Sequence, residues 1–84
     1  MSHNRRPNPD TVAHILRLSK TVAAHPEQIG VFSTGERLAV ALVLDRKDLL
    51  DRPMLEAIER LGFEWFAAAL QVQRDHELHK GGTT

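Results

Sequence analysis

An uninterrupted run of seven apolar residues, Leu38 to Leu44, constrains this chain more than any other feature. Such a run can form a buried strand or a buried helix, and periodicity alone does not distinguish them. The flanking residues do, because Ser33 followed by Glu36 is a capping box, in which each residue's side chain accepts from the other's backbone N–H. The alanines and leucines of the run also favour a helix. We therefore predict a helix at about 34–44 that is apolar all round in its second half, with the rest of the chain packed around it.

A second helix is predicted before this run, from residue 8 to residue 25. Asn8 is a good N-cap, and Pro9 fits the first helical position, where its missing N–H does no harm. Pro26 disfavours the helical conformation of the residue before it and ends the helix. Residues 27–32 have no second strand to pair with, so we expect a loop in which Ile29 and Phe32 cover the core.

Two further helices are predicted after the apolar run. Asp51 is the expected N-cap of the third, which carries Pro53 in its first turn, and a short turn is possible at 48–50. Two arrangements stay open at Gly62. It can end the third helix in a left-handed conformation that closes a Schellman motif, or a continuous helix can run through it at a cost of about 1 kcal/mol. We expect a break or sharp kink, with the last helix running from Glu64 to about residue 78.

These elements predict an all-α fold, a small four-helix domain around the central buried helix with a corner or kink at Gly62. The expected organisation is a disordered arm at 1–7, a single domain at 8–79 and a disordered tail at 80–84. The expected core consists of Ile15, Leu16, Val22, Leu38, Val40, Leu42, Val43, Ile58, Leu61, Phe66 and Leu70.

Composition and motifs exclude several chemistries. The chain has no cysteine, which rules out disulfides and thiolate zinc sites. His76 and His79 are three residues apart, whereas the metalloprotease motif needs its two histidines four apart, so no metal is predicted. The segment from Gly30 to Gly35 resembles a nucleophile elbow but has one residue too many before its serine. We therefore expect neither an enzyme nor a cofactor or small-molecule ligand.

The expected location is the cytoplasm, since the sequence shows neither a signal peptide nor an apolar stretch long enough for a membrane span. Eleven basic and eleven acidic residues cancel, so no basic face for nucleic acid is evident.

A DNA-binding regulator is nevertheless the alternative function. The segment around Gly62 has the order of a helix-turn-helix, and Arg5 and Arg6 would form an arm that contacts phosphates. Ile58 stands where a small residue is usual, and the first turn after the glycine offers Glu64 but no basic side chain to read a base.

Protein binding is the first expectation, because both the central and the last helix are apolar nearly all round. A small bundle normally encloses only one such helix. We expect Phe66 to face the core and Trp65, with Ala68 and Val72, to contact a partner protein or a second copy. The alternative is that apolar loop side chains cover this surface within the chain; they are Ile29, Phe32, Leu49 and Leu50. The expected function is a small cytoplasmic interaction module, either a homodimer or a modulator of another protein.

Overall fold

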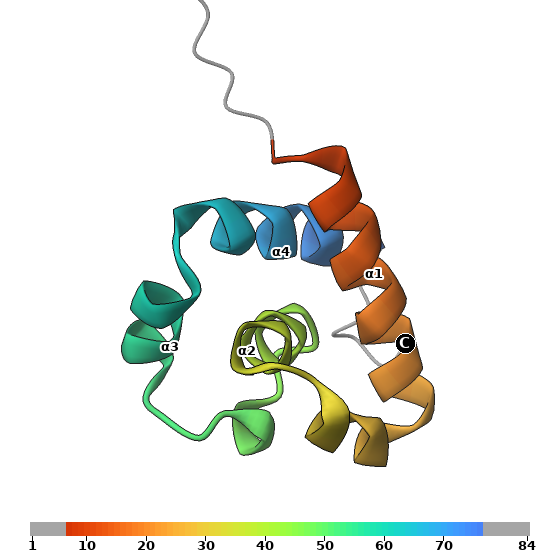
Figure 1. Ribbon diagram of the computed structural model, residues 1–84, viewed down its shortest axis with the longest axis vertical. Helices are drawn as coiled ribbons and strands as arrows, with labels where there is room; N and C mark the ends of the chain where they lie inside the picture. The colour runs from red at the N-terminus through yellow and green to blue at the C-terminus, as the bar shows by residue number, and fades with distance from the viewer. Residues whose placement is uncertain (1–6, 77–84) are drawn as a thin grey trace, which may run out of the picture.

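The structure is a computed structural model that describes residues 7–76, and this part of the chain is helical without any strand. It contains four α-helices and two short 3₁₀ helices (Figure 1). In chain order they are α1 (Pro9–Ala24), η1 (Pro26–Val31), α2 (Thr34–Val43), η2 (Lys47–Leu49), α3 (Met54–Leu61) and α4 (Phe63–His76). The predicted all-α fold with four helices is confirmed.

Helix α2 lies at the centre of the domain. In Figure 1 it is seen almost end-on, with α4 above it, α1 to its right and α3 to its left. Helix α4 contacts α1, α2 and α3, and α1 also contacts α2 directly. Leu38 to Ala41, Val43 and Leu44 are buried, and only Leu42 of the apolar run is half-exposed. The central position predicted for the run is therefore confirmed.

Two helix starts follow the predicted capping chemistry. The Asn8 side chain accepts a hydrogen bond from the backbone N–H of Asp10 at 2.8 Å, and Pro9 opens α1. At the start of α2, the Ser33 N–H donates to Glu36 Oε1 at 2.9 Å, and the Glu36 N–H donates to Ser33 Oγ at 3.3 Å. Each pair satisfies N–H groups that a helix leaves without intrahelical partners.

The start of α3 differs from the prediction. Pro53 occupies the N-cap position and makes no side-chain cap, so Asp51 is not the cap. The Asp51 carboxylate instead accepts from Arg52 Nε at 2.8 Å. It lies two residues too early to reach the first free amides of α3. A short turn near 48–50 does form, as η2 at Lys47–Leu49.

The expected break at Gly62 is confirmed, but its conformation is not the predicted one. Gly62 has φ 93° and ψ 157°, a region that is essentially restricted to glycine and lies far from the left-handed helix. Its N–H donates to the Ile58 carbonyl at 3.2 Å, and its own carbonyl accepts from the Phe66 N–H at 3.0 Å. Gly62 thus ends α3 and starts α4 without a Schellman motif, and Phe63 remains largely exposed.

The core forms between α1, α2 and α4. Of the expected core residues, Ile15, Val22, Leu38, Val40 and Val43 are buried. The other six are only half-buried, namely Leu16, Leu42, Ile58, Leu61, Phe66 and Leu70. Their places are taken mainly by small residues and one valine of the C-terminal half: Ala57, Ala68, Ala69 and Val72. Short side chains let α4 lie close to α1 and α2, which the prediction from apolar bulk did not anticipate.

Three of the four apolar loop side chains named above reach the core, whereas Leu50 is half-buried but does not pack against the core cluster. Ile29, Phe32 and Leu49 are partly buried and pack against the core cluster. None of the helices within residues 7–76 combines the length and apolarity of a membrane-crossing segment. The predicted disordered tail at 80–84, the domain end at 77–79 and all of the predicted arm except Pro7 lie outside the described residues.

Candidate interaction site

An open apolar groove lies where the C-terminal end of α2 meets α3 and α4. Its volume is about 230 Å³. The groove is lined by Leu42, Asp45, Met54, Ile58, Phe66, Ala69, Leu70 and Gln73. Six of these eight side chains are apolar, and apolar linings with a few polar groups are typical of binding sites.

Helical periodicity brings the groove residues together. Met54 and Ile58 are four apart on α3 and therefore share one face. On α4, Ala69, Leu70 and Gln73 follow Phe66 by three, four and seven residues, so these four side chains also share one face. Leu42, in the last turn of α2, forms the third side of the groove.

One polar group of the groove, the amide nitrogen of Gln73, is occupied within the chain. Gln73 Nε2 donates to the Leu42 carbonyl at 3.0 Å and to the Val43 carbonyl at 3.4 Å. These carbonyls lie in the last turn of α2, where helical partners are missing. Asp45 follows with φ 54°, a left-handed conformation that turns the chain away from α2. The Gln73 amide therefore closes the end of α2 and leaves apolar side chains to form most of the groove wall.

Exposed apolar side chains continue this surface beyond the groove. Phe63 is 70% exposed and lies three residues before Phe66, on the same side of α4. Leu55 is 82% exposed and follows Met54 on α3. Val31 is the third large apolar side chain of this kind within residues 7–76, 77% exposed, but it ends η1, which packs against α1. The Phe63 end of α4 and the groove thus form one apolar surface, which we call the corner surface and define by Leu42, Met54, Ile58, Phe63, Phe66 and Leu70.

The expected partner-contact residues lie on a different face of α4 from the groove. Ala68 and Val72 are 0% exposed and belong to the core cluster. Trp65 is half-buried against the same cluster, and its ring meets the His14 ring edge-on, with centroids 6.2 Å apart and planes at 83°. Phe66, expected in the core, instead lines the open groove. The two faces of α4 are therefore exchanged relative to the prediction, because the Ala68 face is the one that fits closely against α1 and α2.

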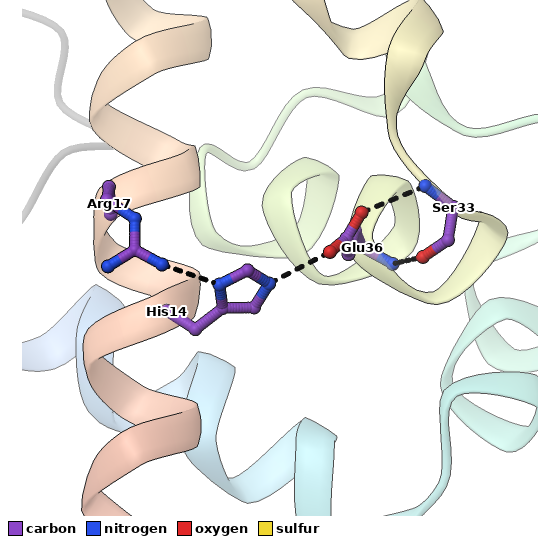
Figure 2. A network of polar contacts seen from close by, with 4 residues as sticks. All are labelled: His14, Arg17, Ser33 and Glu36. Atoms are coloured by element: carbon purple, nitrogen blue, oxygen red, sulfur yellow. Dashed lines mark hydrogen bonds and ion pairs between the residues drawn. The ribbon is translucent and has the colours of Figure 1, made fainter.

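A polar network joins α1 to the start of α2 (Figure 2). Its His14 ring is the one that meets Trp65. His14 Nε2 lies 2.8 Å from Glu36 Oε2, and an Arg17 guanidinium nitrogen lies 3.0 Å from His14 Nδ1. Arginine can only donate, so Nδ1 accepts and Nε2 carries the proton that is donated to Glu36. This geometry places the imidazole between a guanidinium and a carboxylate.

The network acts as a clamp between two helices. The Ser33 N–H, and then the His14 ring, stabilise the carboxylate of Glu36 and lower its pKa below the ordinary value. The Ser33 hydroxyl accepts from the Glu36 N–H and makes its contact at the cap, away from the imidazole (Figure 2). Glu36 thus caps α2 with one oxygen and holds α1 with the other.

Two other sequence features can be placed only in part. Within residues 7–76, no three histidine or acidic side chains gather closely enough to hold a metal ion. His76 is the last described residue, and His79 lies outside the described part. At the Gly62 corner, the exposed side chains of the first α4 turn are Phe63 and Glu64, and Arg5 and Arg6 are not described.

Sequence reasoning missed the groove and the His14 clamp. The groove residues were available as the spacing of Phe66, Leu70 and Gln73, but a second apolar face on the same helix competed with it. The clamp joins residues 22 positions apart, a separation at which no local pattern operates. Comparisons of the chain with protein families, curated proteins and solved structures found no match.

Proposed function

We propose that this chain is a small cytoplasmic protein-interaction module, which binds an apolar side chain or helix of a protein through the corner surface. The single observation that carries this proposal is the open groove of about 230 Å³, whose lining is mostly apolar and which is continued by the exposed Phe63. Grooves of this kind between helices accept apolar anchors of amphipathic helices. Aromatic side chains such as Phe63 and Phe66 are enriched in the central parts of protein interfaces.

Burial supports the choice of this surface over the face originally expected. Trp65, Ala68 and Val72 already make their contacts inside the chain. Phe66, Ile58 and Leu70 are only half-buried, so a partner would remove their remaining apolar area from water without disturbing the core.

Site-specific photocrosslinking in cells tests the proposal. A benzophenone amino acid replaces Phe66 in the groove wall, and in a matched control it replaces Val31, which is equally apolar but lies at the end of η1. We expect protein adducts from position 66 that are absent from position 31. The same adducts should disappear when Met54→Lys places a charge in the groove. Adducts that are identical at both positions, or that survive Met54→Lys, would contradict the proposal, as would the absence of adducts at position 66.

A DNA-binding regulator is the second candidate, and the break between α3 and α4 at Gly62 is the observation that favours it. Its difficulty is electrostatic, because the start of α4 presents Glu64 where a recognition helix needs donors for phosphates and bases. A salt-dependent shift of duplex DNA at low ionic strength would support this candidate, and no shift under those conditions would remove it.

A further inference from the structure

The His14 ring lies at a junction of three helices, away from the groove. It belongs to α1, its Nε2 lies 2.8 Å from Glu36 Oε2 on α2, and it meets the Trp65 ring of α4 edge-on. On the other side of the ring, Nδ1 lies 3.0 Å from the guanidinium of Arg17, one turn later on α1 (Figure 2). Histidine is the side chain that ordinarily changes its charge between about pH 5 and pH 8. A proton that binds to this ring therefore acts on contacts of three helices at once.

The two ring nitrogens respond to that proton in opposite ways. Nδ1 accepts a hydrogen bond from Arg17, which has donors only. A proton on Nδ1 removes this acceptor and places two positive groups side by side. Nε2 donates to Glu36 whether or not the ring is charged, and a charged ring converts this hydrogen bond into an ion pair. Protonation thus breaks one contact of the ring and strengthens the other.

The two partners also differ in their freedom to move. The Arg17 side chain is exposed, and within residues 7–76 its guanidinium has no recorded partner besides the imidazole. It can turn into water at little cost, because a single exposed contact contributes little to stability. Glu36 is held in place, since its Oε1 accepts from the Ser33 N–H at 2.9 Å and its side chain is only 25% exposed. A charged ring therefore stays with Glu36, and Arg17 leaves.

The other charges on the packed helices lie at a greater distance from the ring. On α1, Asp10 stands one turn before His14 and is exposed. On α2, Arg37 lines a separate hollow together with Asp51. On α4, the charge next to Trp65 is Glu64, which lines another hollow. Within the described part of the chain none of these groups makes a hydrogen bond or an ion pair with His14, so the guanidinium and the carboxylate in contact with the ring dominate its response.

We propose that His14 is a proton-operated switch between two partners. Without a proton on Nδ1 the ring bridges Arg17 and Glu36, and with this proton it releases Arg17 and holds α1 to α2 through Glu36 alone. The released guanidinium lies three residues before the exposed Lys20 on α1. Mild acidification thus adds positive charge to the outer face of α1 while the helices stay packed. This switch is independent of the corner surface, so either can fail without the other.

NMR of the full chain labelled with a nitrogen isotope tests the switch during a titration from about pH 8 to pH 5. The ring nitrogens of His14 report the tautomer and the gain of a proton, and the guanidinium of Arg17 reports its own contact. At the alkaline end we expect a proton on Nε2 only. As Nδ1 gains its proton, the Arg17 signals should change to those of a freely moving arginine, with the same midpoint as the ring. Contacts between the rings of His14 and Trp65 should persist throughout.

Matched variants separate the switch from a purely structural role. In His14→Gln the amide can still donate and accept but does not titrate, so the Arg17 signals should no longer change with pH over this range. His25→Gln removes an exposed histidine at the end of α1 and should leave the Arg17 response as in the parent. Arg17→Gln removes a positive neighbour, so the midpoint of the His14 ring should move to higher pH, whereas Glu36→Gln should move it to lower pH.

Far-UV circular dichroism checks that each variant is folded. Arg17 is exposed, so Arg17→Gln provides the test even if Glu36→Gln, which also loses the cap of α2, does not fold. Three results would overturn the inference. They are Arg17 signals that ignore the protonation of the ring, a His14→Gln variant that keeps the pH response of Arg17, and a ring that leaves Trp65 when it gains its proton. A midpoint that stays in place or falls in Arg17→Gln would refute the role of the guanidinium.

Discussion

Trp65→Ala should destabilise the domain strongly, because Trp65 packs against the core cluster and its ring meets His14 edge-on. Truncating a buried tryptophan to alanine costs about 3–5 kcal/mol. Trp65 is only half-buried, so the lower end of that range applies, about 3 kcal/mol. Domains have roughly 0.05–0.15 kcal/mol of stability per residue, which for 84 residues gives about 4–13 kcal/mol. The substitution would therefore remove a large share of the total.

Urea unfolding followed by far-UV circular dichroism measures this loss without relying on the tryptophan signal. A loss of about 3 kcal/mol corresponds to a fall in Tm of about 12–24 °C for a domain of this size. The control is Val31→Ala, a truncation at an exposed position, which should change stability by less than about 0.5 kcal/mol. The reasoning is refuted if Trp65→Ala unfolds like Val31→Ala while Phe66→Ala is severely destabilised, because Trp65 would then face outward and Phe66 inward.

Three further predictions test other parts of the fold. The pKa of Glu36 is lowered, chiefly by the Ser33 N–H, so the unfolded chain binds this proton more tightly than the folded one. The contribution of Glu36 to the free energy of unfolding is fully present above the ordinary pKa of 4.5. It is lost as the pH falls through the lowered pKa of the folded protein. Glu36→Gln should lower the urea concentration at which half of the protein is unfolded at neutral pH, and should make that concentration fall less steeply as the pH is lowered. If the urea midpoints of parent and variant fall in parallel with pH, this prediction is contradicted. Gly62→Ala should cost about 1–3 kcal/mol in thermal melts because of its positive φ. Gly30→Ala, where an added methyl group has no neighbour within 4 Å, should change stability by less than about 1 kcal/mol, and equal effects at both glycines would be inconsistent with strain at Gly62. Ser19 is fully buried, and its hydroxyl has no hydrogen-bond partner within the described residues, so Ser19→Ala should raise Tm by an amount equivalent to about 1 kcal/mol. A fall in Tm would indicate that the hydroxyl is bonded.

Local chemistry made most of the helix boundaries predictable. Asn8 and Pro9 at α1, and Ser33 with Glu36 at α2, act on N–H groups within three residues, so sequence spacing contains the whole interaction. The break at Gly62 was also predictable as a position, because glycine weakens any helix. The backbone conformation of Gly62 was not predictable, since glycine can adopt several backbone geometries and the neighbouring helices select one of them.

The orientation of α4 differs from the predicted one for a different physical reason. Helix α4 has two apolar faces, one with Trp65, Ala68 and Val72 and the other with Phe66 and Leu70. The sequence favours burying the second, since Phe66 shares that side of the helix with Phe63 and Leu70, whereas the first includes the small side chain of Ala68. Close approach of helices favours the first, because small side chains allow α4 to contact both α1 and α2.

The sequence by itself therefore determined that this chain is all-helical, that a helix at about 34–44 lies at its centre and that the chain turns at Gly62. These properties depend on composition, caps and periodicity, which operate over a few residues. Only the tertiary structure decided how α4 is rotated about its axis, and with it which side chains form the core and which line the groove. The rotation depends on how α1, α2 and α4 fit together at once, and on long-range contacts such as the Gln73 amide at the end of α2 and the His14 ring against Glu36. Contacts of this kind join residues more than 20 positions apart, where the pattern of one helix contains no information about its neighbours.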